Sequence, residues 1–378
     1  MAAPLLALIS VSLLATNPVS AQSSSAAQAL ALEQEGKLPE AEEAWRQVVE
    51  RNPQDGAAFA SLGLVLSRQQ KYREAATAYR RSIALDPKLP GVQLNLGLAE
   101  FKQGNFRAAI GPLRAALASN SQNTQARTLL GLSYYGAGQF AAAVDDLQPL
   151  AQADSANIEL HNVLAQSCLQ AKKFSCAFEE FRLILQQKPD SPASHVLLGE
   201  ALDGLGRTPE AIVEFQAAAK LAPQEPNVNF GLGYLHWKSH QYDDAQRDFE
   251  NELAIDPRNA QALAYLGDIE MKRNDPEKAL ASLRKATELR GDLRIAYVDM
   301  GAILAEQKQY PDAVTSLQRA VKMDPSQPDA HFRLGRVYQA MGNKAAAQKE
   351  FAKVRELHQK ADDVASQMPA ATPAPAKP

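Results

Sequence analysis

A unit of 34 residues recurs without a gap over most of this 378-residue chain. Residues 56–89 show it clearly, reading GAAFASLGLVLSRQQKYREAATAYRRSIALDPKL, and Gly56 is taken here as position 1 of the unit. Position 20 is an alanine in all ten units: Ala41, Ala75, Ala109, Ala143, Ala177, Ala211, Ala245, Ala279, Ala313 and Ala347. Such a fixed period predicts an array of units that stack on their neighbours, because one unit alone cannot bury its apolar face.

Each unit is predicted to form two helices. Apolar residues of Ala57–Gln69 and of Arg73–Leu85 fall at the i, i+3, i+4, i+7 spacing of one helix face. The second helix should end at Asp86, because proline disfavours the helical conformation in the residue before it. Half of the units place glycine in the polar corner between the helices, as a left-handed helix cap requires. These glycines are Gly36, Gly104, Gly138, Gly206 and Gly342.

Position 8 is also restricted, since eight of the ten units have glycine there. Glycine inside a helix costs about 0.5–1 kcal/mol relative to alanine. Its recurrence therefore indicates that a neighbouring group presses against the helix at this point. The small residue at position 20 is the expected partner, which predicts an antiparallel helix pair with a tight waist.

The full pattern resembles the tetratricopeptide repeat. It rests on positions 4, 7, 8, 11, 20, 24 and 32, occupied by Phe59, Leu62, Gly63, Leu66, Ala75, Tyr79 and Pro87. Ten units fit: 22–55, 56–89, 90–123, 124–157, 158–191, 192–225, 226–259, 260–293, 294–327 and 328–361. Some depart from the pattern, with Gln28-Ala29 replacing Leu-Gly and Ser121, Ser155, Gly291 and Gln359 replacing proline. The resemblance implies an all-α, right-handed superhelical solenoid of antiparallel helix pairs.

The two ends differ from the repeats. Residues 1–21 carry no Asp, Glu, Lys or Arg, and an apolar run, Leu5–Ala15, precedes the small-x-small sequence Val19-Ser20-Ala21. This arrangement predicts a signal peptide of residues 1–21 and an exported protein, periplasmic or secreted, in a bacterial envelope. The apolar run is too short for a membrane span, and a disordered N-terminal extension is the alternative. Residues 367–378 are rich in Pro and Ala and are predicted to be disordered.

Charge and motifs exclude several classes of function. The chain has 40 basic and 43 acidic residues, interspersed, for a net charge of −3. Neither a nucleic-acid-binding surface nor a polybasic membrane patch is therefore expected. The sequence contains no G-x-S-x-G, glycine-rich phosphate loop or H-E-x-x-H. We expect no catalysis and no cofactor.

The histidines are expected to be structural. His161, His195 and His331 occupy position 4, where Phe59 and Tyr297 stand in other units, and are predicted to be partly buried packing residues. His236 and His240 have the H-x-x-x-H spacing that can present two ligands on one helix face. Without a third ligand no metal site is predicted. Two acidic pairs, Glu179-Glu180 and Asp243-Asp244, are expected on exposed helix faces.

The two cysteines leave two interpretations open. Cys168 and Cys176 stand at positions 11 and 19 of one unit, on either side of its corner. A helix hairpin can bring them together, and disulfides persist in exported proteins. Alternatively, both are small buried apolar residues.

The resemblance also implies a binding groove lined by positions 2, 5, 9, 12 and 13 of each first helix. Units two to four offer apolar residues there: Ala60, Leu64, Leu94, Leu98, Phe101, Leu132 and Tyr135. Units five and six offer Asn162, Gln166, Gln170, Glu200 and Asp203, and unit seven offers Phe230, Tyr234 and Trp237. Packing on neighbouring helices is the alternative for Leu64 and Leu98. Ligand contact is favoured for Tyr234 and Trp237, whose polar edges suit a hydrated interface.

These observations predict an exported, non-catalytic scaffold that binds a protein or an extended peptide in its groove. The alternative is a self-associating or structural subunit of a cell-envelope or export machine.

Overall fold

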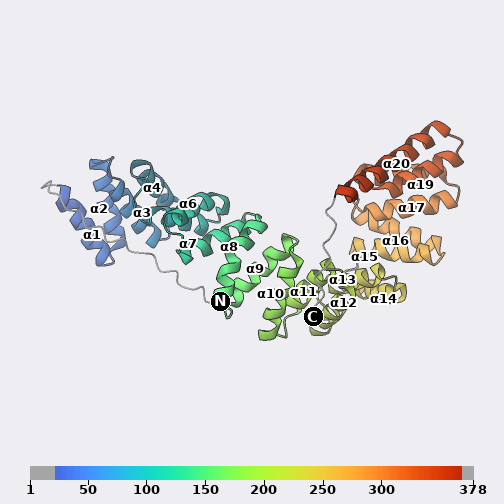
Figure 1. Ribbon diagram of the computed structural model, residues 1–378, viewed down its shortest axis with the longest axis horizontal. Helices are drawn as coiled ribbons and strands as arrows, with labels where there is room; N and C mark the ends of the chain where they lie inside the picture. Colours follow the sequence, from blue (N-terminus) through green and yellow to red (C-terminus); the bar gives the residue numbers. More distant parts are fainter. Residues whose placement is uncertain (1–21, 368–378) are drawn as a thin grey trace. The chain divides into compact units, whose positions relative to one another are not determined.

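The computed structural model describes residues 22–367, which form twenty helices and no strand (Figure 1). The predicted signal peptide, 1–21, and residues 368–378 of the predicted tail lie outside the described residues. The chain divides into two compact units. Unit 1 extends to Pro189 and includes Glu200–Leu205, and unit 2 contains Asp190–Gly199 and the chain from Gly206 onward.

Unit 1 contains α1 (Gln22–Gln34), α2 (Leu38–Arg51), α3 (Gly56–Arg68), α4 (Tyr72–Leu85), α5 (Val92–Lys102), α6 (Phe106–Ser119), α7 (Thr124–Gly136), α8 (Phe140–Ala153), α9 (Ile158–Gln170) and α10 (Phe174–Gln187). Helix α11 (Pro192–Gly204) is divided between the two units. Unit 2 continues with α12 (Thr208–Leu221), α13 (Val228–Lys238), α14 (Tyr242–Ile255), α15 (Ala260–Lys272), α16 (Pro276–Leu289), α17 (Arg294–Glu306), α18 (Tyr310–Met323), α19 (Pro328–Ala340) and α20 (Lys344–Gln367). The predicted all-α fold of consecutive helix pairs is confirmed.

The last helix is longer than the repeat pattern predicts. Helix α20 has 24 residues, whereas the second helices α2 to α18 have 14 each. It continues past the tenth repeat unit to Gln367, a residue that the sequence assigned to the disordered tail. The helix can extend this far because the first proline after Lys344 is Pro369, and the disorder of the tail stays a prediction.

The corner between the two helices has the same backbone geometry in all ten repeats. Position 15 has a positive φ of 57° to 76° in each of them. Glycine occupies five of these corners, and the other five hold Gln70, Lys172, His240, Asn274 and Lys308. The predicted left-handed cap is confirmed, and it forms even where a side chain makes that conformation unfavourable.

The close contact between the two helices of each pair is made by a different residue than predicted. A Cβ atom on Gly97 would lie 2.5 Å from Cγ of Leu113, and one on Gly63 would lie 2.6 Å from the ring of Tyr79. Leu113 and Tyr79 stand at position 24 of their units. Position 20 contributes less: the backbone oxygen of Ala279 would lie 3.2 Å from a Cβ on Gly267. The large side chain at position 24, not the alanine at position 20, is the main partner of the glycine.

Several of the first helices begin at short polar caps. Asp55, Asn123 and Asn259 stand at the last position of their units, and each accepts a hydrogen bond from a backbone N–H three residues further on. Such side chains satisfy N–H groups that have no partner within the helix. In these repeats the last residue of one unit therefore caps the start of the next helix.

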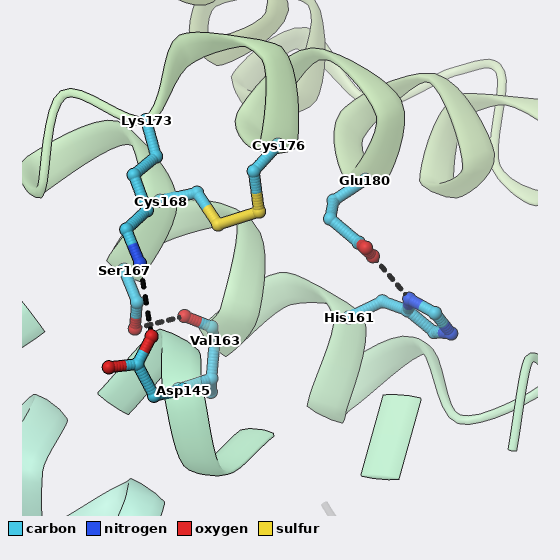
Figure 2. Close-up of a disulfide and its surroundings, with 8 residues drawn as sticks. All are labelled: Asp145, His161, Val163, Ser167, Cys168, Lys173, Cys176 and Glu180. Atoms are coloured by element: carbon cyan, nitrogen blue, oxygen red, sulfur yellow. Dashed lines mark hydrogen bonds and ion pairs between the residues drawn. A yellow bond between two sulfur atoms is a disulfide. The ribbon is translucent and has the colours of Figure 1, made fainter. Parts of the chain in front are cut away.

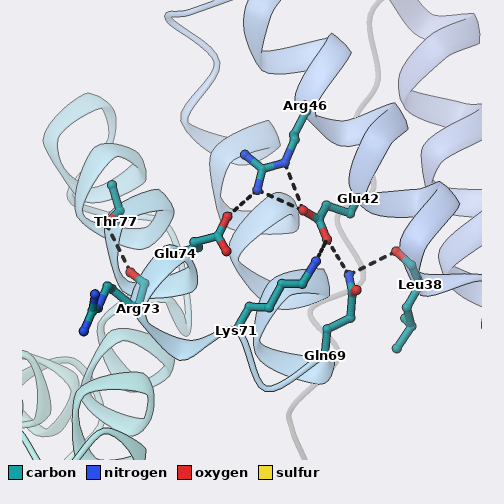
Figure 3. Close-up of polar contacts among 8 residues, drawn as sticks. All are labelled: Leu38, Glu42, Arg46, Gln69, Lys71, Arg73, Glu74 and Thr77. Carbon is teal, nitrogen blue, oxygen red and sulfur yellow. Dashed lines mark hydrogen bonds and ion pairs between the residues drawn. The ribbon is translucent and has the colours of Figure 1, made fainter.

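Within each unit, the repeats pack in sequence along the chain. Each second helix packs on the first helix of the next repeat, and first helices of consecutive repeats also pack on each other, as in α3·α5 and α15·α17. We call the surface formed by these first helices the inner face. Polar contacts add to the packing between the first two repeats (Figure 3). There the Glu42 carboxylate accepts hydrogen bonds from Arg46, Lys71 and Gln69.

A disulfide joins Cys168 in α9 to Cys176 in α10 (Figure 2). Their Cα atoms are 5.7 Å apart, within the range that a disulfide spans. Of the two interpretations that the sequence leaves open, the structure forms the bridge. It links the two helices of the fifth repeat across the corner at Lys172.

The three position-4 histidines do more than pack. His161, His195 and His331 are each hydrogen-bonded through Nδ1 to a glutamate nineteen residues later, on the second helix of the same repeat. The partner of His161 is Glu180 (Figure 2), whose side chain is only 16% exposed. The prediction of an exposed Glu179-Glu180 pair was therefore wrong for Glu180, which is directed at the imidazole.

Within residues 22–367, no helix combines the length and the hydrophobicity needed to cross a membrane.

Candidate functional site

The inner face of unit 2 gathers the aromatic residues that the sequence singled out. Phe230, Tyr234 and Trp237 follow the i, i+4, i+7 spacing on α13, so they share one face of that helix. Phe230 packs inward, with its ring centroid 5.8 Å from that of Phe249. Tyr234 and Trp237 are partly buried, and their rings stack at 6.1 Å. All three side chains are partly buried, so this face of α13 packs on its neighbours and keeps some exposure along its length.

A fourth ring, Tyr265 of α15, completes this cluster. Its centroid lies 4.9 Å from Trp237 and 5.6 Å from Tyr234, with edge-to-face geometry in both cases. Burial, with smaller effects of Tyr234 and Asp268, raises the pKa of Tyr265 to about 12. The hydroxyl therefore stays protonated at neutral pH and can donate a hydrogen bond.

Charged groups lie beside the rings. The indole Nε1 of Trp237 donates to Oδ2 of Asp268 at 2.5 Å, and Lys272 forms an ion pair with the other oxygen of this carboxylate. The Lys272 ammonium is 5.7 Å from the ring centroid of Trp237 and 5.8 Å from that of Tyr242. At these distances the ring faces attract a cation. One lysine thus contacts both a carboxylate and two aromatic rings.

A second carboxylate, Asp299 of α17, lies near the first and is only 4% exposed. Among the described residues, none forms a hydrogen bond with its buried Oδ2. Burial, with the nearby charge of Asp268, raises the pKa of Asp299 to about 7. Native proteins satisfy most buried polar atoms, so this oxygen is an exception that calls for an explanation.

The charges that act on Asp299 come from both neighbouring first helices. Helix α15 supplies Asp268 and Lys272, and α19 supplies Arg333 and Asp329. Asp329 is itself paired with Arg294. The carboxylates of Asp268 and Asp299 therefore share one region. In the described part of the chain, Lys272 is the only residue that forms an ion pair with either of them.

In unit 1 the predicted groove residues are used differently. Leu94 and Leu98 are 3% and 5% exposed and pack in a cluster with Leu113 and Leu129. The prediction that they line an open groove was wrong, because neighbouring helices cover them, and packing is the correct alternative for Leu98. Phe101 is partly buried against the same cluster.

The amide-rich zone of unit 1 is partly satisfied internally. The Tyr135 hydroxyl donates to Oε1 of Gln166, which connects the first helices of consecutive repeats. Asn162 and Gln166 are partly buried. Whether these residues contact a partner stays a prediction.

The H-x-x-x-H pair does not form a site. The imidazole of His236 is buried and hydrogen-bonded to Asp248, 2.6 Å between Nδ1 and Oδ2. His240 lies in the corner with a φ of 60° and contacts the hydroxyl of Tyr242. Over the described residues, no three His, Cys, Asp or Glu side chains are grouped as metal ligands would be.

Sequence reasoning missed Tyr265, Asp268 and Asp299. Asp268 stands at position 9 of its unit, one of the groove positions that the family resemblance implies, but only units two to seven were read at those positions. Tyr265 and Asp299 stand at position 6, which was not among them. Acidic residues at inner positions of consecutive units were the available signal.

The folding of unit 1 and of unit 2 defines a repeat solenoid, the architecture of a protein-interaction scaffold. Models described as tetratricopeptide repeat match residues 26–90, 182–226, 230–292 and 329–361, and one described as TPR repeat matches 301–342. Together they match more than half of the chain, which therefore belongs to the tetratricopeptide repeat family. A further model, described as anaphase-promoting complex, cyclosome, subunit 3, matches residues 102–182.

Several similar proteins are named as members of complexes. The chain is 25% identical over 150 residues to anaphase-promoting complex subunit 3 of Schizosaccharomyces pombe, covering 40% of this chain and 23% of that protein. It is 32% identical over 124 residues to human anaphase-promoting complex subunit 7, covering 32% and 22%. The alignments thus span less than a third of these relatives. The crystal structure of the APC/C hetero-tetramer Cut9-Hcn1 has a TM-score of 0.52 at 12% identity, covering 92% of this chain and 84% of that chain, a likeness of fold alone.

Proposed function

We propose that this chain captures an extended segment of a partner protein on the inner face of its first helices. One observation carries the proposal: rings and carboxylates of α13, α15 and α17 gather at one place on that face, and Asp299 keeps an oxygen without an internal hydrogen bond within the described chain. Aromatic residues with polar edges are frequent in the centres of interfaces.

The relatives support a role in assembly. The matched proteins carry the names of anaphase-promoting complex subunits and of a BBSome complex member, so each is named for the complex that contains it. A scaffold of helical repeats provides an extended surface for such contacts. The proposal takes from these names only that this chain binds protein.

We also propose that the chain acts outside the cytoplasm. The apolar N-terminal segment with its small-x-small sequence and the disulfide between Cys168 and Cys176 both support export. In an oxidising compartment the bridge persists, because no pool of reducing thiols is present to break it. Mass spectrometry of the exported protein should find Gln22 at the N-terminus and the two cysteines bridged.

Site-specific photocrosslinking tests the inner-face proposal. Phe332 of α19 stands at inner position 5 and is 50% exposed, whereas Val213 of the second helix α12 is 60% exposed. Benzoylphenylalanine replaces each in turn, and crosslinked partners are identified by mass spectrometry. A partner that crosslinks through position 332 and not through 213 supports the proposal, and the reverse pattern contradicts it.

Self-assembly is the second candidate, because stacked repeats can continue head-to-tail onto another copy. Sedimentation velocity over a range of concentrations separates the two functions. A scaffold for other proteins keeps its sedimentation coefficient, whereas a self-associating subunit sediments faster as concentration rises.

A further inference from the structure

The inner face of unit 2 holds two neighbouring carboxylates and one ion-paired lysine. Asp268 accepts hydrogen bonds from Trp237 and Lys272, so both of its oxygens have partners. Asp299 is buried, yet in the described chain nothing hydrogen-bonds to its Oδ2. A buried carboxylate without a partner destabilises the fold unless it is protonated or paired. Groups that oppose stability in this way concentrate at functional sites.

The rings beside these carboxylates already contact a cation. Lys272 reaches from the end of α15 over the rings of Trp237 and Tyr242, and its ammonium group is paired with Asp268. Its side chain is 35% exposed, whereas that of Asp268 is 5% exposed. The lysine is therefore the more exposed partner of this ion pair.

We propose that the cluster of Tyr234, Trp237, Tyr265, Asp268 and Asp299 binds the cationic side chain of an extended peptide, an arginine or a lysine. In the free protein Lys272 holds the place of that side chain, and it moves aside when the peptide binds. The inference rests on the proposed function, because it names the chemistry of the segment that the inner face captures.

The charges of the cluster select a cation over other ligands. Two carboxylates repel an anionic side chain, and an apolar one leaves the oxygen of Asp299 without a hydrogen bond. Guanidinium and ammonium groups can donate to both carboxylates while resting against the rings. A guanidinium group has five donors in a planar fork, so arginine should bind more tightly than lysine.

The affinity for such a peptide should rise with pH. A proton on Asp299 competes with the incoming cation, and Asp299 is half protonated near pH 7. The other charges facing Asp299 are Asp268 and Lys272 on α15 and Arg333 and Asp329 on α19. The increase over that range is assigned to Asp299, whose pKa of about 7 lies within it.

Peptide binding to the full exported chain, carrying its disulfide, tests the proposal. The peptides are fluorescein-labelled chains of alanine and serine whose termini are blocked, so that the termini carry no charge. They differ only in one central residue, which is arginine, lysine, citrulline or norleucine. Fluorescence anisotropy at pH 8 should show the arginine and lysine peptides binding about tenfold more tightly than citrulline and norleucine, respectively, as one added charged hydrogen bond predicts.

Three variants sharpen the test. Asp299→Asn should abolish the preference for the cationic peptides and the increase in affinity from pH 6 to 8. Lys272→Met should bind the cationic peptides several-fold more tightly, because an internal competitor is gone. The matched control is Asp312→Asn, which removes an exposed carboxylate of α18 and should leave both the preference and its pH dependence unchanged.

The outcomes separate this inference from the proposed function. Equal binding of charged and uncharged peptides, or a cation preference that survives in Asp299→Asn, overturns the inference. Crosslinking of a partner through position 332 would still support inner-face capture in that case. Weaker cationic binding by Lys272→Met would also overturn the inference, since it would make the lysine part of the ligand contact.

Discussion

Two buried carboxylates, one in each unit, have opposite surroundings. Glu42 of unit 1 is 9% exposed and accepts hydrogen bonds from Arg46, Lys71 and Gln69 (Figure 3). Burial alone would raise the pKa of Glu42, but these hydrogen bonds outweigh it and hold the pKa below its ordinary value. Asp299 of unit 2 is more deeply buried, at 4% exposed, and its pKa is raised to about 7.

The difference separates a carboxylate that stabilises the stack from one that does not. Glu42 connects the first repeat to the second through donors on both sides of the interface. Asp299 stands at an inner position among charges that act on it from two helices, without a hydrogen bond to Oδ2 inside the described chain. The same repeat architecture therefore carries one acid as part of its structure and the other as a site for a ligand.

The largest effect is expected from Asp299→Asn. The ionised carboxylate opposes folding, because its pKa is raised from 3.8 to about 7. Each unit of pKa corresponds to about 1.4 kcal/mol, so the amide should increase the stability of unit 2 at pH 8 by about 4 kcal/mol. The sign follows from linkage: a carboxyl whose folded pKa is raised costs nothing well below its unfolded pKa, and its full penalty appears above the folded pKa. The gain should therefore shrink from pH 8 to pH 5.

Thermal unfolding of the parent and variant at both pH values measures this effect. Asp312→Asn is the matched control and should show no such change with pH. A destabilised Asp299→Asn protein at pH 8 would mean that the carboxylate has a stabilising partner after all.

A smaller effect of opposite sign is expected at Glu42. Glu42→Gln should lower stability by about 1–3 kcal/mol at pH 7, because three donors lose a charged acceptor. The pKa of Glu42 is lowered in the folded protein, so its contribution is present above the unfolded pKa and is lost as pH falls through the folded pKa. The deficit of the variant should accordingly fade in acid.

Urea denaturation at pH 7 and pH 3 checks this expectation. Glu43→Gln, an exposed neighbour on the same helix, is the control and should stay within about 0.5 kcal/mol of the parent. Equal losses for the two variants would remove the contrast between Glu42 and Asp299.

The smallest effect concerns a feature in which the two units should not differ. Gln70 in unit 1 and Lys308 in unit 2 both adopt a left-handed corner, with φ of 61° and 62°. Left-handed geometry costs a residue with a side chain about 1–2 kcal/mol. Glycine avoids this cost, but it loses more conformational entropy on folding, which offsets part of the gain. Gln70→Gly and Lys308→Gly should each stabilise their unit by about 0.5 kcal/mol in denaturant titrations.

Gly104→Ala is the reciprocal test. A Cβ at this corner meets no atom within 4 Å, so any destabilisation reports the backbone conformation alone. A neutral Gly104→Ala would show that the corner geometry is not the reason for glycine there.

Much of the fold was predictable, because the same positions serve the same purpose in every unit. The period located the ten pairs, and the corner glycines identified the left-handed cap that Gln70 and Lys308 also adopt. The waist partner was not predicted, since spacing alone does not reveal that Leu113 reaches over Gly97.

The candidate site was only half predictable. Tyr234 and Trp237 were visible as a stripe on one helix, but their neighbours Tyr265 and Asp299 come from other repeats. Burial separated the true inner surface from the packed one, because Leu94 and Leu98 hold groove positions in sequence and core positions in space. Oδ2 of Asp299 has no hydrogen-bond partner among residues 22–367, and this is a property of the assembled unit that no local sequence pattern contains.

The most direct measurement of the central claim is the titration of the Asp299 carboxyl itself. Carbon-13 NMR of protein labelled at aspartate Cγ, with the Asp299→Asn spectrum for assignment, follows this group with and without the arginine peptide. We expect a pKa near 7 in the free protein that falls toward the ordinary aspartate range when the peptide is bound. A carboxyl that already titrates near its ordinary value in the free protein, or one that the saturating peptide leaves unchanged, would contradict the account.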